Sequence, residues 1–169
     1  VYCLAKLNNF ESMEDFGMII CRHFLSEYPK VCNRITVTIT KDNWERIATT
    51  VDSKGKPAPH KHAFKRAGPM TSYTRVVGEK RPGKDVTINI ASGFRDLQIL
   101  KTTQSGFEGF HRCKYTSLPE VRDRLFGTSA SVEWVVNPKL IGRSKINFDK
   151  VAKTIEVALV NTFAGPSDK

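Results

Sequence analysis

Residues 126–136 alternate between the two faces of an extended chain. One face carries Phe126, Thr128, Ala130, Val132, Trp134 and Val136. Successive side chains of a strand point to opposite faces, so this pattern predicts a strand that buries one face. The same period of two recurs at residues 35–39, 86–90 and 97–99. Burial of one face is typical of antiparallel sheets.

A helical period governs the residues after Ser12. Ser12 and Asp15 have the spacing of a capping box, and apolar residues then recur at helical intervals over residues 16–28. Pro29 ends this run, because proline removes a backbone hydrogen bond. We expect an amphipathic helix of about four turns here. The apolar spacing within residues 1–7 favours a short helix before it.

A second amphipathic helix is predicted after Asn147, which is a favoured N-cap residue. Asp149 falls in the first turn, where a helix favours negative charge, and apolar residues continue to Phe163. Gly165 and Pro166 terminate the pattern. Together, half-buried strands and amphipathic helices predict an α+β fold, with an antiparallel sheet and helices on one face.

Breaks in the pattern divide the first strands. The alternation slips at residues 41–43, as a β-bulge would cause, and residues 52–57 predict a turn. A second, basic strand begins near His62. Residues 67–69, with the sequence Ala-Gly-Pro, are the best candidate for an internal boundary.

The next strands are also separated by glycines. Residues 71–77 and 86–90 read as strands joined by a turn over residues 78–83. Ser92 and Gly93 predict a break or bulge before Leu97.

The net charge of +10 is concentrated in residues 53–84, which carry nine basic residues against one acidic residue, Glu79. The basic residues are Lys54, Lys56, Lys61, Lys65, Arg66, Arg75, Lys80, Arg81 and Lys84. Such a basic cluster attracts anions, whether nucleic acid, phosphates or a small anionic substrate. An equally good interpretation is a set of solvated strand edges whose lysines discourage edge pairing.

The cysteines and histidines carry little chemistry. His60 and His62 lack a third and fourth ligand at a suitable spacing, so no metal site is predicted. No apolar run is long enough to span a membrane, so we expect no membrane partner. The four cysteines include no CxxC pair, which favours a reducing compartment; they are Cys3, Cys21, Cys32 and Cys113.

An irregular loop with several aromatic residues follows the strand that ends near Leu100. Glycines flank Phe107, and Pro119 fits the first turn of a short helix over residues 118–122, which Arg124 follows. An aromatic ring and a guanidinium group are suited to a flat anionic heterocycle: the ring stacks on its face and the guanidinium fork binds its edge. Each residue also has an alternative role. Phe107 could belong to the core, and Arg124 could be solvated or paired with Asp123.

The same loop has many specified positions at fixed spacing: Leu100, Lys101, Thr102, Thr103, Ser105, Phe107, Phe110, Tyr115, Leu118 and Arg124. This pattern resembles the signature of the urate oxidase (uricase) family. The flanking segments HFLSEYP and GKPAPH resemble that family in order and spacing, so the likeness covers nearly the whole chain. Cys113 departs from the pattern, because an acidic residue is expected there.

The resemblance implies a T-fold (tunnelling fold) with two tandem halves. Residues 1–68 would be the C-terminal part of the first half and residues 69–169 the N-terminal part of the second. The family forms homotetramers with each site at a subunit interface, and it is peroxisomal. These properties are expectations for this chain.

The resemblance also implies the chemistry. The complete enzyme oxidises urate with O2 to 5-hydroxyisourate and hydrogen peroxide without a metal or organic cofactor, so positioning and electrostatics must act in place of a cofactor. Phe107 is implied to stack on the purine and Arg124 to bind its edge. No catalytic residue is implied here: the family's Lys, Thr and His relay and its Gln and Asn align outside residues 1–169, so this segment alone is expected to be inactive. The alternative function is a basic nucleic-acid-binding module without catalysis.

Overall fold

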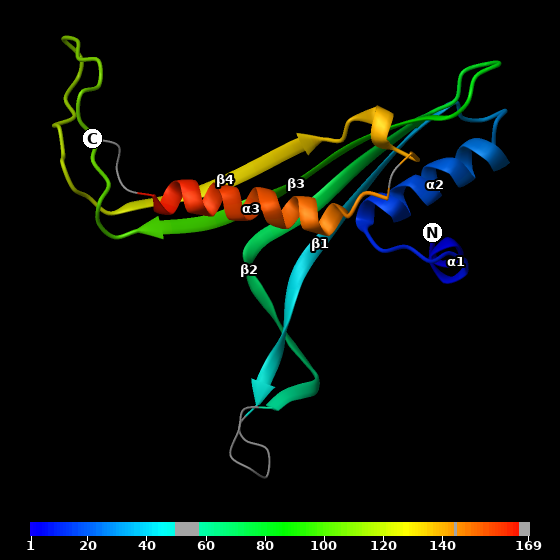
Figure 1. Cartoon of the computed structure of the whole chain (residues 1–169), viewed down its shortest axis with the longest axis horizontal. Coiled ribbons are helices and arrows are strands. Elements are labelled where there is room, and N and C mark those ends of the chain that lie inside the picture. Colours follow the sequence, from blue (N-terminus) through cyan, green and yellow to red (C-terminus); the bar gives the residue numbers. More distant parts are fainter. Residues whose placement is uncertain (50–57, 144, 166–169) are drawn as a thin grey trace.

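The computed structural model describes residues 1–49, 58–143 and 145–165 (Figure 1). The turn predicted over residues 52–57 and the terminator Pro166 lie outside this range. In chain order the elements are α1 (Tyr2–Leu7), α2 (Met13–Glu27), β1 (Arg34–Thr49), β2 (Ala58–Glu79), β3 (Thr87–Lys101), β4 (Phe126–Val135), the 3-10 helix η1 (Pro138–Leu140) and α3 (Phe148–Ala164).

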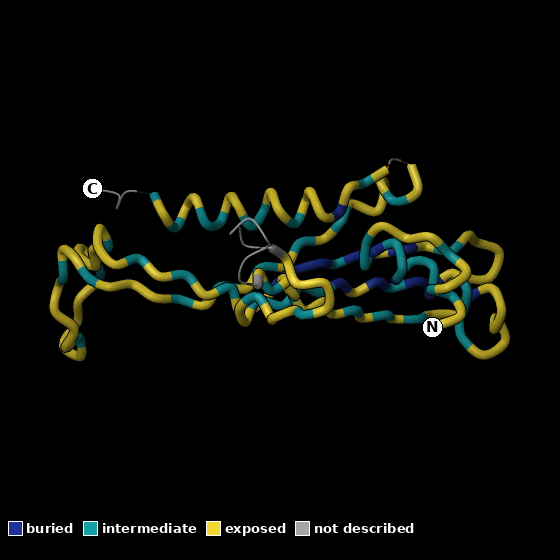
Figure 2. The backbone as a smooth tube through the Cα atoms, turned by 90° about the horizontal axis from the view of Figure 1, so that it is seen from below, coloured by how far each residue is buried: buried dark blue, intermediate teal, exposed yellow. Residues whose placement is uncertain are grey.

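Four strands form one sheet in the order β1-β2-β3-β4, and every neighbouring pair is antiparallel. Each strand therefore pairs with its neighbour in sequence. Helix α2 packs on β1 and β2, and α3 runs along one side of the sheet (Figures 1 and 2). The predicted α+β fold with an antiparallel sheet is confirmed.

The core lies between α2, the sheet and the first turn of α3. Its fully buried or nearly buried apolar residues are Ile20, Cys21, Leu25, Val76, Ile88, Ile90, Phe94 and Phe148. Because Phe148 joins the same cluster as Cys21 and Val76, both helices lie on the same face of the sheet. Figure 2 shows the buried stretches gathered at the α2 end, whereas the opposite end of β3 and β4 is largely exposed.

Both predicted helix caps are present. The Ser12 hydroxyl accepts a hydrogen bond of 3.0 Å from the Asp15 backbone N–H, and the Asn147 side chain accepts one of 2.9 Å from the Lys150 N–H. Each bond satisfies an N–H that the first helical turn leaves free. These local contacts explain why the sequence located both helix starts correctly.

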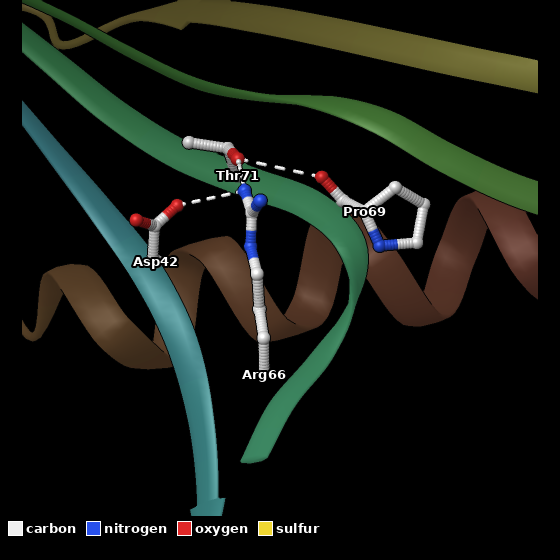
Figure 3. A network of polar contacts seen from close by, with 4 residues as sticks. All are labelled: Asp42, Arg66, Pro69 and Thr71. Atoms are coloured by element: carbon white, nitrogen blue, oxygen red, sulfur yellow. Dashed lines mark hydrogen bonds and ion pairs between the residues drawn. The ribbon is translucent and has the colours of Figure 1, made fainter.

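The phase slip predicted in the first strand is confirmed as an irregularity between β1 and β2. Asp42 pairs with Thr71, whereas Trp44 pairs with Arg66, so residues 67–70 bulge from β2. The Arg66 guanidinium reaches across to Asp42 at 2.8 Å and to the Thr71 hydroxyl at 3.1 Å (Figure 3). The candidate boundary at residues 67–69 therefore lies inside a continuous strand, and the division of the chain at residue 68 stays a prediction.

The bulge predicted at Ser92 and Gly93 lies slightly later in β3. The pairing of β3 with β4 shifts between Phe94 and Leu97, and Asp96 has a φ of 60°. Gly93 remains in register because it has no side chain. A Cβ there would lie 2.3 Å from the Val132 carbonyl oxygen and 2.8 Å from the Tyr73 ring.

Candidate functional site

The segment between β3 and β4, residues 102–125, projects beyond the ends of both strands (Figure 1). We call it the β3–β4 loop. Lys101, the last residue of β3, donates a hydrogen bond through Nζ to the Gly165 carbonyl oxygen just after α3. The base of the loop is thus tied to the C-terminal end of α3.

The loop folds back on itself as a hairpin. Phe107 and Val121 exchange two backbone hydrogen bonds, of 2.6 and 3.0 Å, and the Gly109 N–H donates to the Glu120 carboxylate at 3.2 Å. The helix predicted over residues 118–122 is therefore wrong. Pro119 is compatible with a first helical turn, but pairing with Phe107 holds this segment extended.

Asp123 fastens the second side of the hairpin to the first. Its carboxylate accepts hydrogen bonds from the Thr103 hydroxyl at 2.8 Å and from the Ser105 N–H at 3.5 Å. The Thr103 hydrogen bond, followed by backbone N–H groups that include Ser105, lowers the pKa of the Asp123 carboxyl. Asp123 is thus engaged by this side of the loop, whereas Arg124 makes no ion pair with it.

Phe107 and Arg124 lie against each other, and each has an aromatic neighbour besides. The Arg124 guanidinium carbon is 4.8 Å from the centre of the Phe107 ring. The Phe110 ring stacks on Phe107 with centroids 4.5 Å apart and planes 19° apart. Phe107 retains 36% exposure, so it is not a core residue. The structure brings the two predicted site residues together, while their role in binding stays a prediction.

The Arg124 side chain carries polar groups that the protein does not satisfy. Its Nε atom is buried and has no hydrogen-bond partner in the part of the chain that the structure describes. Among the described residues, the guanidinium forms no ion pair within 4 Å. Buried donors are almost always paired, since an unpaired donor costs free energy. A donor left unpaired next to an exposed aromatic ring suits a ligand that brings acceptors.

Sequence reasoning missed the aromatic support on the far side of Arg124. The guanidinium carbon also lies 5.4 Å from the centre of the Phe126 ring. Phe126 in turn stacks on Phe163 of α3, with centroids 5.5 Å apart and planes 25° apart. The i, i+2 spacing of Arg124 and Phe126 on an extended chain was a signal for their common face. Nothing local linked Phe126 to Phe163.

Arg112 has partners within the hairpin. Its pairing was in question because position 113 holds a cysteine where the family pattern has an acidic residue. It lies over Phe110 at 5.3 Å and donates to the Leu118 carbonyl oxygen at 2.9 Å. Cys113 itself is exposed. A hydrogen bond from the Tyr115 N–H is the largest cause that lowers the pKa of its thiol, and a hydrogen bond from the Thr116 hydroxyl is the second. An acidic residue at position 113 is therefore unnecessary for holding Arg112.

The basic cluster does not form one binding surface. Its described members extend from the outer part of the β1–β2 hairpin to the β2–β3 turn, at different ends of the molecule (Figure 1). Four members have a carboxylate within 4 Å: Lys65 with Glu45, Arg66 with Asp42, Arg75 with Glu133, and Arg81 with Glu79. Lys54 and Lys56 lie outside the described residues. Partial neutralisation of this kind agrees better with solvated strand edges.

The described parts of the chain show neither a cluster of metal ligands nor a membrane-spanning helix. No group of three His, Cys, Asp or Glu side chains there is placed to hold a metal ion. The His60 ring nitrogen Nδ1 instead accepts hydrogen bonds from the backbone N–H groups of His62 and Ala63. None of the helices within residues 1–49, 58–143 and 145–165 has both the length and the apolar character needed to cross a bilayer.

The antiparallel sheet, with its helices on one face and the aromatic and arginine residues at one end, defines a T-fold domain. The crystal structure of uricase from Arthrobacter globiformis aligns with a TM-score of 0.72 and 28% identity, covering 96% of this chain and 49% of that one. The crystal structure of a hyper-thermostable AgUricase mutant aligns with a TM-score of 0.76 and 26% identity, covering 99% of this chain and 50% of the mutant chain.

Sequence comparison finds the same similarity. Residues 90–169 match the family model described as Uricase. The uricase of Dictyostelium discoideum is 37% identical over 164 residues, 97% of this chain and 52% of that protein. The uricase of Oryctolagus cuniculus is 37% identical over 169 residues, 100% of this chain and 51% of that protein.

The chain is similar to uricases over its whole length, and it spans about half the length of the curated relatives it matches. The predicted resemblance and the T-fold are confirmed. None of these matches supports the nucleic-acid-binding interpretation of the basic cluster.

Proposed function

We propose that this chain supplies substrate-binding residues to a urate oxidase, with Phe107 on the face of urate and Arg124 on its edge. The observation that carries the proposal is the buried, unpartnered Nε of Arg124 beside the exposed Phe107 ring. Urate is flat, anionic and bordered by carbonyl oxygens and ring nitrogens. It therefore offers a π-face for Phe107 and acceptors for the guanidinium fork.

Binding requires a local rearrangement. The guanidinium carbon lies 4.8 Å from the centre of the Phe107 ring, and Phe110 also stacks on that ring. A purine that stacks on the Arg124 side takes space next to the guanidinium, which then moves from the ring face to the purine edge. Arginine suits this exchange better than lysine, because its planar fork binds two acceptors at once.

The reaction of the complete enzyme is the oxidation of urate by O2 with water to 5-hydroxyisourate and hydrogen peroxide. Without a cofactor, the catalytic contribution is rigid positioning of an electron-rich anion. We assign Phe107 and Arg124 to this positioning and give neither a proton-transfer role. The purine-degrading role, the homotetramer with sites at subunit interfaces and the peroxisomal location are further parts of the proposal. They rest on the similarity of this chain to uricases.

Titration calorimetry with urate in the absence of oxygen tests the binding roles. A hydrogen bond to a charged group contributes about 1.5–3 kcal/mol, so Arg124→Ala should weaken binding about 10- to 100-fold. Phe107→Ala should weaken it to a similar extent, because aromatic stacking on a base contributes about 1–3 kcal/mol. Arg124→Lys should restore little, since it keeps the charge but loses the fork.

Arg122→Ala is the matched control. Arg122 is two residues away, its side chain is 92% exposed, and it lies 3.5 Å from the Glu108 carboxylate. Removing it takes away the same formal charge without touching the site, so binding of urate should stay nearly unchanged. Equal affinity in Phe107→Ala, Arg124→Ala and the unaltered chain would exclude these residues as the urate site.

A further inference from the structure

Six side chains from three elements form one continuous series of π contacts, which we call the stack. In order they are Arg112, Phe110, Phe107, Arg124, Phe126 and Phe163. The first four belong to the β3–β4 loop, Phe126 begins β4, and Phe163 lies in the last turn of α3. The stack therefore connects the proposed binding residues to a helix that contributes no residue to the site itself.

The Arg124 side chain is not fixed by an ion pair with any described residue. Its Nε has no hydrogen-bond partner, and its guanidinium group has no carboxylate partner among the described residues. Contacts with the Phe107 and Phe126 rings are the interactions that orient it. Arginine has many rotamers, so it needs such contacts to present its fork in one direction.

Phe126 depends in turn on α3. The Phe126 and Phe163 rings are nearly parallel, with planes 25° apart, and both are partly exposed. The end of α3 is held independently where Lys101 Nζ donates to the Gly165 carbonyl oxygen. This bond keeps Phe163 near Phe126 at the base of the loop, so the end of α3 is a fixed support for the stack.

We infer that Phe126 and Phe163 are positioning residues that hold the Arg124 guanidinium next to the Phe107 ring, from where it turns to the edge of its ligand. The inference deepens the proposed function and takes from it only the identity of the ligand. It assigns a role to the last turn of α3: loss of the Phe163 ring frees the Phe126 ring, and Arg124 then samples other rotamers.

The first test needs no ligand. The Arg124 guanidinium carbon lies within 5.4 Å of the centres of two rings, so the Nε–Hε proton resonance should be displaced by ring currents and its motion on the ps–ns timescale restricted. Both properties are measured by NMR on the full 169-residue chain. Phe163→Leu keeps an apolar side chain but removes the ring, and it should shift the resonance toward a free-arginine value and lower its order parameter. Phe163→Tyr keeps the ring and should preserve both. An unchanged Arg124 resonance in Phe163→Leu would overturn the inference.

The second test asks whether this positioning affects binding. Urate affinity, measured without oxygen, should fall about 3- to 10-fold in Phe163→Leu and stay near the unaltered value in Phe163→Tyr. Leu159→Ala is the matched control, because Leu159 is a half-buried residue one turn earlier on α3 and lies outside the stack. It loosens helix packing without removing a ring, so affinity should change less than in Phe163→Leu. An equal fall in both variants would show that helix packing alone matters and would overturn the inference.

The two tests separate the two proposals. An Arg124 resonance that responds to Phe163→Leu, together with urate affinity that is unchanged in Arg124→Ala, would support the positioning role and contradict the proposed function. Urate binding that depends on Arg124 but is indifferent to Phe163→Leu would support the proposed function and contradict the positioning role.

Discussion

The Arg124 guanidinium carbon lies 5.4 Å from the centre of the Phe126 ring, and the buried Nε of the same arginine has no hydrogen-bond partner. Two effects on stability oppose each other here. Each cation–π contact at a partly exposed site stabilises by about 0.5–1 kcal/mol. The unpaired donor costs about 1–3 kcal/mol. The net contribution of Arg124 to folding is therefore close to zero, which agrees with the binding role proposed for it.

Arg124→Met should leave the free energy of unfolding within about 1 kcal/mol of the unaltered chain, or raise it, because the thioether packs between two rings without an unpaired donor. The measurement is chemical denaturation of both chains in the absence of ligand. A loss well above 1 kcal/mol would identify Arg124 as a structural residue and weaken its assignment to a ligand.

The link between Thr103 and Asp123 predicts a dependence on pH. The Thr103 hydrogen bond is the largest cause of the lowered pKa of Asp123. A carboxyl group whose pKa is lower in the folded state stabilises that state above the unfolded pKa of about 3.9. This contribution is lost as the pH falls through the lowered folded-state value.

Thr103→Val removes the donor hydroxyl and should raise the pKa of Asp123 toward its ordinary value. Titration of the Asp123 carboxyl carbon followed by NMR measures this directly. Thr102→Val, at the exposed neighbouring position, is the control and should leave the titration unchanged. A pKa of Asp123 that is the same in the unaltered chain and in Thr103→Val would show that the hydroxyl is not the cause.

Sequence reasoning succeeded where neighbouring residues decide the structure. Ser12 and Asn147 cap their helices through residues three positions away, and the alternation over residues 126–136 is reproduced in the burial of β4. Such signals are contained within one or two turns or along one strand. The predicted proximity of Phe107 and Arg124 did not come from a local signal of this kind, because it depended on the family pattern.

The failures have a common physical cause, which is pairing between distant residues. Residues 118–122 carry a local helix signal in Pro119, but Val121 pairs with Phe107 and stays extended. The contact of Phe126 with Phe163 joins β4 to the end of α3 and leaves no trace in either local pattern. Tertiary contacts of this kind outweigh local propensity, which amounts to only a few tenths of a kcal/mol per residue.

The cysteines should differ sharply in reactivity. Hydrogen bonds from the Tyr115 N–H and the Thr116 hydroxyl lower the pKa of the exposed Cys113 thiol, whereas burial raises the pKa of Cys21. The thiolate is the nucleophile, so Cys113 should be alkylated by iodoacetamide at a lower pH than an ordinary thiol, and Cys21 should be protected in the folded chain. Thr116→Val should shift the pH profile of Cys113 alkylation upward, as measured by mass spectrometry. An unshifted profile would contradict the role given to the Thr116 hydroxyl.

Gly93 should tolerate no side chain. A Cβ there would lie 2.3 Å from the Val132 carbonyl oxygen, which belongs to the paired backbone of β4 and cannot move independently. Gly93→Ala should lower the free energy of unfolding by about 3 kcal/mol, at the upper end of overpacking effects. Gly127→Ala is the matched control in the same sheet, because its Cβ would meet only the end of the Leu100 side chain at 3.4 Å. That change should be neutral to within about 0.5 kcal/mol. Equal stability of the two variants in urea denaturation would refute the predicted clash.

A buried polar series connects α2 to the middle of the sheet. The Ser92 hydroxyl donates to Glu14 Oε1 at 2.6 Å and lies 2.9 Å from the Thr74 hydroxyl, and all three residues are at most 5% exposed. Ser92→Ala leaves Glu14 buried without this donor, so the free energy of unfolding should fall by about 1–3 kcal/mol. Ser26→Ala is the control, since the Ser26 hydroxyl bonds only to the His23 carbonyl oxygen at an exposed position of α2. Its effect should stay within about 0.5 kcal/mol.

The double variant Glu14→Gln with Ser92→Ala should lose less free energy of unfolding than the sum of the losses in the two single variants, because the two groups are hydrogen-bonded to each other. Strict additivity in that double-mutant cycle would show that the Glu14–Ser92 bond contributes nothing to stability.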